Sequence, residues 1–496
     1  MGWNARKARS RAGPWTALLL ALALWHAASR AFTRAPSPRR QSPRHRPAPG
    51  GLAPRPASSA GRAEAPPTDA PDGAGGGLPS VEGRPGFTDR EAFREGPSVS
   101  FWRDFDPERA DPLEGVNLLG EDLPYWLYHL GRTGFFMAQG VLGVALAAAN
   151  GRSGAGGESI LPDFLRGAAD APAEFVGAVG ANAAAAFAQD LGYIRQGCFK
   201  MPYDMAPRHR QWSPAFVLDK GLRYVRESAR TLRRSARRAG TEVWVNGEGL
   251  YPEYYRHTFH YQSDGWLSSD SAAVYETSTE TLFAGRQDAM QRTTLVHLSR
   301  HLEALGLPEG RGARLLELAC GTGRLLTFAR DSWPGLSVTA SDLSPYYLEE
   351  ARRSHAYWER EFAPRSRGAA AFAQANAEAL PFAAESFDAV ISVYLFHELP
   401  AAAQDAVVAE AARVLRPGGL FVLTDSVQLG DRPSQDGVQG RFGGFAEPHY
   451  QAYIRRDLAA LARAHGLRPH EKEVSSATKS LSFLKPHAGR GPPGPG

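Results

Sequence analysis

The order of apolar and polar residues predicts alternating strands and helices in the second half of the chain. The clearest unit begins with a short apolar run, residues 315–318, of the kind that forms a buried strand. A glycine turn, a segment with helical spacing at 325–330 and a second apolar run at 336–340 then lead to Asp342. Strand, glycine turn, helix, strand and acid in this order predict half of a βαβ unit that binds a nucleoside.

Further apolar runs continue this alternation toward the C-terminus. After a predicted helix at 346–361, we expect a third strand at 370–374, a fourth at 389–393 and a fifth at 420–424. The fourth run is apolar almost throughout, which is typical of a parallel strand that is buried on both faces. The pattern therefore predicts an α/β fold with a doubly wound parallel sheet.

The residues before this sheet have mainly helical patterns. Residues 251–298 open with aromatic side chains and then show long helical spacing from 268 onward. Upstream, the apolar residues 135–149 predict a buried or interfacial helix, and the alanine-rich residues 181–189 predict another. Arginines recur at three- and four-residue spacings in 219–239, opposite apolar residues. Such a stripe favours a solvated helix face, with contact to anionic lipid or a polyanion as the alternative.

The first part of the chain has the composition of targeting segments. Residues 1–30 combine arginines, an apolar stretch and small residues, which predicts a signal peptide, with an uncleaved anchor as the alternative. Residues 31–95 begin rich in Arg, Ser, Pro and Ala, as in transit peptides, and continue as a linker. With Phe32 near the junction, this arrangement resembles the bipartite presequences of algae with complex plastids. We therefore expect plastid localisation, with the secretory pathway or membrane anchoring as the alternative.

Charge and cysteine content narrow the classes of function. The formal net charge is +5, but the first acidic residue is Glu64, so the positive charge gathers in the predicted targeting arm. The excess of arginine therefore indicates targeting, and no specific nucleic-acid partner is expected. Cys198 and Cys320 are the two cysteines of the chain, which excludes a disulfide framework and a cysteine-based zinc site. No metal ligands are predicted.

The glycine turn restricts the nucleoside that it can bind. A dinucleotide site needs a third glycine where Leu326 stands, and a P-loop needs a lysine and a hydroxyl residue that this turn lacks. The stretch Glu317-Leu-Ala-Cys-Gly-Thr-Gly-Arg324 instead resembles motif I of the class I S-adenosylmethionine-dependent methyltransferases. The turn Arg-Val-Leu-Arg-Pro-Gly-Gly at 413–419 is similar to that of methyltransferase type 11, which includes the ubiquinone and menaquinone enzymes. Residues 251–298 and Glu-Pro-His-Tyr at 447–450 resemble a group found in cyanobacteria and plastids.

This resemblance implies a Rossmann-like, doubly wound sheet of seven strands with a helical N-terminal cap. A mainly helical region and a disordered targeting arm would precede it. The predicted divisions are a signal peptide at 1–30, a transit peptide and disordered linker at 31–95, a mainly helical region at 96–245, the helical cap at 246–310, the methyltransferase domain at 311–486 and a disordered tail at 487–496.

S-adenosylmethionine is the cofactor that the resemblance implies. Glu317 would lie near its cationic amino-acid end, and Asp342 would accept hydrogen bonds from the ribose hydroxyls. Asn376 stands where the family usually has an acid that meets the adenine, so an amide would replace it there. The implied cofactor-binding residues are Glu317, Ala319, Cys320, Gly321, Thr322, Gly323, Asp342, Leu343, Asn376 and Ala377.

Catalytic candidates follow the fourth and fifth predicted strands, whose carboxyl ends should face the reacting methyl group. His397 is the candidate general base because a histidine pKa can lie near working pH. The alternative is that His397 only orients its loop or stacks on the cofactor. Tyr394 is a second candidate, and Asp425 and His449 are weaker ones. The predicted cap contributes possible lid residues, with aromatic packing as the alternative role: His257, His260 and Tyr261.

The predicted function is methyl transfer from S-adenosylmethionine to a small, apolar plastid metabolite such as a quinone or a pigment precursor. One alternative is a catalytically silent methyltransferase fold that acts as a binding module, although Gly321, Gly323 and Asp342 are intact. Another is a protein or RNA methyltransferase, which is disfavoured because the fourth strand lacks the Asn/Asp-Pro-Pro-Tyr/Phe signature. Peripheral membrane association is compatible with the arginine stripe, and the sequence gives no oligomeric state.

Overall fold

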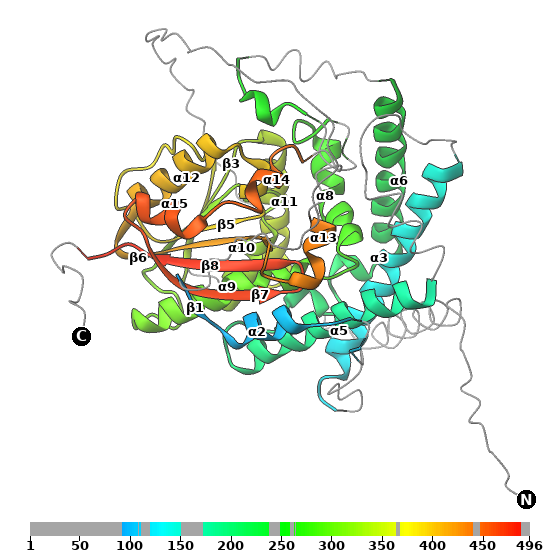
Figure 1. The fold of residues 1–496 in the computed structure, drawn as a ribbon, viewed down its shortest axis with the longest axis horizontal. Helices are drawn as coiled ribbons and strands as arrows, with labels where there is room; N and C mark the ends of the chain where they lie inside the picture. Colours follow the sequence, from blue (N-terminus) through cyan, green and yellow to red (C-terminus); the bar gives the residue numbers. More distant parts are fainter. Residues whose placement is uncertain are drawn as a thin grey trace, which may run out of the picture.

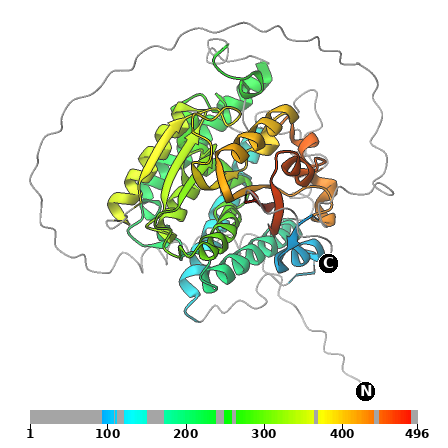
Figure 2. The same ribbon diagram turned by 90° about the vertical axis from the view of Figure 1, so that its left-hand side faces the viewer.

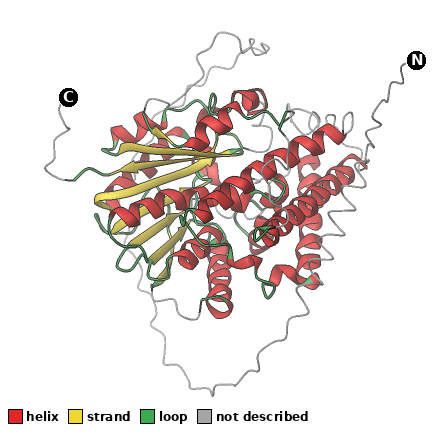
Figure 3. Ribbon diagram, turned by 90° about the horizontal axis from the view of Figure 1, so that it is seen from below, coloured by secondary structure: helices red, strands yellow, loops and turns green. Residues whose placement is uncertain are grey.

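The computed structural model describes residues 92–107, 109–110, 120–149, 172–237, 249–257, 262, 264–363, 368–439 and 447–487. These residues build one mixed sheet with helices on both of its faces, and further helices extend to one side (Figures 1 and 2). In Figure 3 the strands gather toward one side of the molecule, and helices fill the other side. The predicted signal peptide, nearly all of the predicted transit peptide and linker, His260 and Tyr261 lie outside the described residues.

The sheet has eight strands in the order β1-β7-β8-β6-β5-β2-β3-β4. All neighbouring pairs are parallel except those of β8, which runs antiparallel to both β6 and β7. The strands are β1 (Arg94–Glu95), β2 (Arg314–Leu318), β3 (Ser337–Asp342), β4 (Ala370–Gln374), β5 (Phe387–Val393), β6 (Leu415–Ser426), β7 (Arg468–Ser475) and β8 (Thr478–Leu484).

The predicted sheet of seven strands corresponds to β2–β8, and strand β1 is a correction to it. Arg94 and Glu95 pair with Glu471 and Lys472 at the edge of the sheet, although they fall in the predicted linker. A strand of two charged residues has no apolar alternation, so its place is decided by the partner strand rather than by its own sequence. The five strands predicted from apolar runs all form, within a few residues of the expected bounds.

Alternate side chains of the central strands point to two separate cores, as in a doubly wound fold. Leu316 and Phe421 belong to a core under α12 (Ala401–Val414) and α15 (Leu458–Ala464). Leu315 and Val422 point the other way, to a core with three helices: α9 (Gln287–Ala304), α10 (Arg324–Ser332) and α11 (Pro345–Glu361). Both faces are covered, which explains why the central strands read as continuous apolar runs.

The predicted cap contains two helices. Helix α8 (Ser269–Leu282) ends before Ala284 and Gly285, which adopt φ angles of 50° and 80°, and α9 follows them. A Cβ at Gly285 would lie 3.0 Å from the backbone nitrogen of Thr133, so glycine permits close approach to a neighbouring helix. The helical spacing across 268–298 continues through this break and did not indicate it.

The N-terminal helices pack against the sheet and the cap. They are α2 (Pro97–Asp104), α3 (Leu123–Ala149), α5 (Pro172–Arg195) and α6 (Pro214–Arg237). Among the described helices, none combines the length and apolar character that a membrane span requires. Short helices complete the fold: η1 (Tyr203–Met205), η2 (Arg210–Trp212), η3 (Glu253–Tyr255), η4 (Phe396–Glu398), η5 (Pro433–Gln435), α13 (Asp436–Gln439) and α14 (Tyr450–Tyr453).

A buried ion pair joins the N-terminal helix α5 to the cap helix α9. The Arg292 guanidinium donates to both carboxylate oxygens of Asp190, at 2.9 and 2.6 Å, and both side chains are almost fully buried. Tyr125 of α3 donates to the same carboxylate at 2.6 Å. Two helices of the predicted N-terminal region and one of the cap therefore share a polar centre.

We predict that Asp190→Ala destabilises the protein by about 3–5 kcal/mol, because it leaves the Arg292 guanidinium buried without a compensating charge. Denaturant unfolding would measure the change. Asp219→Ala is the matched control, since Asp219 forms an exposed pair with Arg223 on α6 and its loss should change stability by less than about 1 kcal/mol. If Asp190→Ala also lowered the free energy of unfolding by less than about 1 kcal/mol, the buried pair with Arg292 would contribute little to stability.

Candidate active site

The carboxyl ends of the parallel strands β2, β3, β5 and β6 lie at the same end of the sheet, and a pocket lies there. It is lined by the glycine turn after β2, by α8 and the start of α9, and by Tyr394 at the end of β5. Glu317, Ala319, Cys320, Gly321 and Thr322 of the predicted set all line it. Its volume of about 40 Å³ is far below the roughly 300 Å³ of a typical small-ligand site.

The glycine turn has a backbone conformation that few other residues would permit. Gly321 and Gly323 have φ angles of 55° and 72°, and Ala319 has a φ of 51°. A Cβ at Gly323 would lie 3.0 Å from the Cβ of Ala351 on α11, so a larger residue would push the turn away from that helix. The turn therefore brings backbone N–H groups close to the sheet edge.

Asp342 fixes this turn from the end of β3. Its two carboxylate oxygens accept hydrogen bonds from the Gly321 and Ser344 N–H groups, each at 2.8 Å. Burial raises the pKa of Asp342 to about 6, although these two hydrogen bonds lower it. Each oxygen keeps a further lone pair, so the carboxylate can still accept hydroxyl donors. The next residue, Leu343, is half-buried, and its carbonyl accepts the Gln374 amide at 3.1 Å.

Glu317 carries the clearest sign of a missing partner. Its side chain is 3% exposed and lines the pocket, and within the described structure its Oε2 has no hydrogen-bond partner. Burial, and then the charge of Asp342, raises the pKa of Glu317 to about 8. A buried carboxylate oxygen without a donor is costly, and a cationic ligand group in the pocket would satisfy it. The residues present therefore fit a ligand with an ammonium group and a ribose.

Of the remaining predicted cofactor residues, some line the pocket and others lie outside it. Cys320 is buried, and burial raises its thiol pKa well above the ordinary value, so it serves as a small neutral residue. The Thr322 hydroxyl donates to Glu276 of α8 at 2.9 Å, which ties the turn to the cap. Asn376 and Ala377 follow β4, next to Asp342 along the sheet edge, but they do not line the pocket. Their contact with an adenine stays a prediction.

Tyr394 lies in the pocket in a strained conformation. Its φ angle is 55°, which is uncommon for a residue other than glycine and typical of functional sites. Its hydroxyl shares a hydrogen bond of 2.7 Å with Thr478, and its ring stacks on Phe283. Burial raises the pKa of the Tyr394 hydroxyl well above its ordinary value, so it stays protonated. Tyr394 can therefore shape the pocket and donate a hydrogen bond.

His397 is buried beside Asp425, which the sequence had suggested as a weaker candidate. Its Nδ1 lies 2.5 Å from Asp425 Oδ1, and Asp425 Oδ2 accepts the Phe396 N–H at 2.7 Å. Burial lowers the pKa of His397, but the charge of Asp425 and its hydrogen bond outweigh this and raise it well above the ordinary value. The imidazole is then a poor proton acceptor at neutral pH, and its role as a general base stays a prediction.

His449, which follows Glu447 in the chain, lies near Glu398 and near His257 of the predicted lid. The His449 ring contacts Tyr254. His257 packs edge-on against Trp266, which fits the aromatic packing that was the alternative to a lid role. The lid function stays a prediction.

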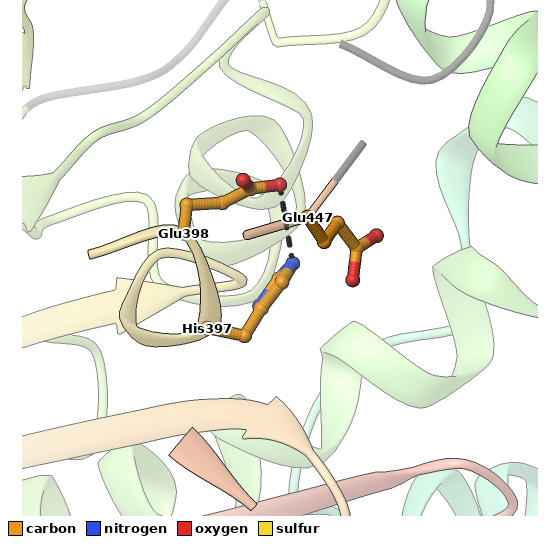
Figure 4. A group of neighbouring side chains, drawn as sticks. All are labelled: His397, Glu398 and Glu447. Atoms are coloured by element: carbon orange, nitrogen blue, oxygen red, sulfur yellow. Dashed lines mark ion pairs between the residues drawn. The ribbon is translucent and has the colours of Figure 1, made fainter. Parts of the chain in front are cut away.

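Two acids that are not among the predicted site residues stand next to His397. Glu398 and Glu447 are buried, and one ligand atom from each and from His397 lie within 4.8 Å of one another (Figure 4). Glu398 follows His397 directly at the end of the fourth predicted strand, which was a usable signal. Glu447 comes from a distant segment, and its Glu-Pro-His-Tyr motif indicated a family resemblance but not a position beside His397.

The comparisons with known proteins agree with this geometry. A family model described as a methyltransferase domain matches residues 315–419. A ubiquinone/menaquinone biosynthesis C-methyltransferase of Desulfotalea psychrophila is 33% identical over 211 residues, which cover 41% of this chain and 80% of that protein. A demethylmenaquinone methyltransferase of Thermus thermophilus is 35% identical over 184 residues, which cover 36% of this chain and 73% of that protein.

Other relatives match over a shorter part. A malonyl-[acyl-carrier protein] O-methyltransferase of Enterobacter lignolyticus is 41% identical over 118 residues, covering 24% of this chain and 41% of that protein. The chain thus spans about two fifths of the length of that relative. The residues matched by the family model, 315–419, contain the glycine turn and strands β3, β4 and β5. With the Desulfotalea protein matched over most of its length, the chain belongs to the class I S-adenosylmethionine-dependent methyltransferases.

Proposed function

We propose that the protein transfers a methyl group from S-adenosylmethionine to a small, apolar, quinone-like or pigment-like acceptor in a plastid. The observation that carries the methyl-donor part is Glu317 Oε2, which is buried at the pocket, has no hydrogen-bond partner among the described residues and lies near the charge of Asp342. The acceptor class is supported by the names of the Desulfotalea and Thermus relatives. The compartment is supported by the composition of residues 1–95.

The chain offers a partner for each polar end of the cofactor. Glu317 would hold the ammonium group, Asp342 would accept the ribose hydroxyls, and Gly321, which lines the pocket, would leave room for the ligand beside the backbone. Gly323 instead lets the turn pack closely against α11. When bound, S-adenosylmethionine supplies a methyl group on a good leaving group. The protein therefore mainly has to align the acceptor and exclude water.

The wall of the pocket toward β5 is suited to those two tasks. Tyr394 and Tyr275 line the pocket, and the Phe283 ring stacks on Tyr394. Burial raises the pKa of both tyrosine hydroxyls, so they remain neutral hydrogen-bond donors. An aromatic wall with neutral donors fits a flat, apolar ring that carries oxygen atoms.

Helix α6 supports a further part of this proposal, peripheral association with a membrane. Leu218 and Leu222 are 63% and 58% exposed, and Arg226 beside them is exposed as well. Exposed leucines flanked by arginine favour the surface of an anionic bilayer. An apolar acceptor dissolved in a membrane could reach the protein from that surface.

We predict that the affinity for S-adenosylmethionine rises about tenfold or more between pH 6 and pH 8. The pKa of Glu317 is about 8, so most Glu317 is neutral at pH 6 and becomes ionised as the pH rises, and only the ionised form attracts an ammonium group. Calorimetric titration at several pH values would measure it. Glu317→Gln should weaken binding and flatten the pH dependence, whereas Glu309→Gln, at an exposed site, should change neither. An unchanged profile in Glu317→Gln would place the ammonium group elsewhere.

We also predict methyl transfer from labelled S-adenosylmethionine to a lipid of a plastid extract or to a demethylated quinone. Asp342→Ala should lower cofactor affinity about 10- to 100-fold, because it removes an ionised hydrogen-bond acceptor, and should reduce labelling in parallel. Mass spectrometry of the labelled lipid would identify the acceptor atom. Cofactor binding without any labelled lipid, but with labelled protein or RNA, would refute the proposed acceptor class.

A further inference from the structure

We propose that His397, Glu398 and Glu447 bind one divalent transition-metal ion next to the cofactor pocket. The ion would hold an oxygen atom of the methyl acceptor, and this second part rests on the proposed function. The binding site itself follows from the geometry of the three side chains and of Asp425.

The three side chains come from two segments and converge on one point. His397 and Glu398 belong to η4 at the end of β5, and Glu447 precedes α14 (Figure 4). His397 Nε2 lies 3.4 Å from Glu398 Oε1, and all three ligand atoms lie within 4.8 Å of one another. Ligands that bind one ion at about 2.1 Å are separated by roughly 3–4 Å, so small side-chain rotations would complete the site.

Asp425 prepares His397 for this role from the opposite side of the ring. Its carboxylate accepts from Nδ1, so that nitrogen keeps its proton, while a metal ion would replace the proton on Nε2, which faces Glu398 and Glu447. Asp425 is itself fully buried and is held by the N–H groups of Phe396 and His397, at 2.7 and 3.3 Å. A carboxylate behind a histidine is the usual way in which proteins orient a metal-binding imidazole.

The charges of this corner also favour a cation. His397 forms ion pairs with both Asp425 and Glu398, and Glu447 stands on the same side as Glu398. One imidazole, which carries at most a single positive charge, therefore faces three buried carboxyl groups. Buried carboxylates are costly unless they are paired or coordinate a metal ion, and a dication would balance more of this charge than one proton does.

The donor set indicates the kind of ion. One imidazole nitrogen and two carboxylates suit ions such as Zn²⁺ and Mn²⁺, whereas Mg²⁺ prefers oxygen donors alone. Three protein ligands leave at least one coordination position open, as in catalytic rather than structural sites. Tyr394, which lies between β5 and η4, lines the cofactor pocket, so the open position would be near that pocket.

The test is calorimetric titration of the full-length protein, first treated with a chelator, with ZnCl₂ or MnCl₂. We expect one ion per chain that the wild type binds and that His397→Ala or Glu447→Gln binds at least about 100-fold more weakly. Asp425→Asn should weaken binding about 10- to 100-fold, since it acts only through His397. The matched control is His449→Ala, a neighbouring histidine outside the cluster, which should keep the wild-type affinity. Electron paramagnetic resonance of bound Mn²⁺ would report whether nitrogen is a ligand.

Folding and cofactor binding must be measured on the same variants. Glu447→Gln should retain cooperative unfolding and S-adenosylmethionine affinity, because Glu447 lies outside the cofactor pocket. Binding of Zn²⁺ and Mn²⁺ that is equal in the wild type and in the His397→Ala, Glu447→Gln and Asp425→Asn variants would overturn the site. Metal binding as expected, with no effect of the ion on labelling of any lipid acceptor, would overturn only its role toward the acceptor. A wild-type protein that does not bind S-adenosylmethionine would instead count against the proposed function.

Discussion

The arrangement of the cofactor turn depends on Arg324, the first residue of α10. Its guanidinium donates to both oxygens of Asp288 on α9, at 3.1 and 2.6 Å, and pairs with Asp204 of η1. Arg132 of α3 joins the same group of charges through Glu280, at 2.7 Å, and Asp288, at 3.3 Å. A buried guanidinium is tolerable only when carboxylates surround it, so the turn, the cap and the N-terminal helices must assemble together.

This network gives the N-terminal helices a role that their sequence did not indicate. They position Asp204 and Arg132, without which Arg324 and Asp288 would be buried with incomplete partners. Burial raises the pKa of Glu280 to about 7, even though the charge of Arg132 lowers it. The cost of burying the Glu280 carboxylate is therefore only partly offset by its ion pair with Arg132. The N-terminal helices are therefore joined to the methyltransferase fold by a shared network of buried charges.

The sequence predicted the parts of the structure that are encoded locally. The apolar runs of the central strands, the glycine turn and the acid at the end of β3 each have a signature within a few residues, and all form as expected. Strand β1 and the break at Gly285 could not be predicted, because distant partners determine both. The same holds for Glu447, which meets His397 only because the last segment folds back over the end of β5.

The acidic side chains of the cofactor pocket favour a positively charged ligand. Glu317 and Asp342 lie beside the glycine turn, where burial raises the pKa values of both carboxyl groups and each becomes easier to ionise when a cation approaches. S-adenosylmethionine carries a positive sulfur that becomes neutral once the methyl group has left. An acidic pocket of low dielectric therefore attracts the donor more strongly than the spent cofactor, which favours exchange after each transfer. The same acidity explains why the turn needs no lysine, since a phosphate-binding cation there would repel this cofactor.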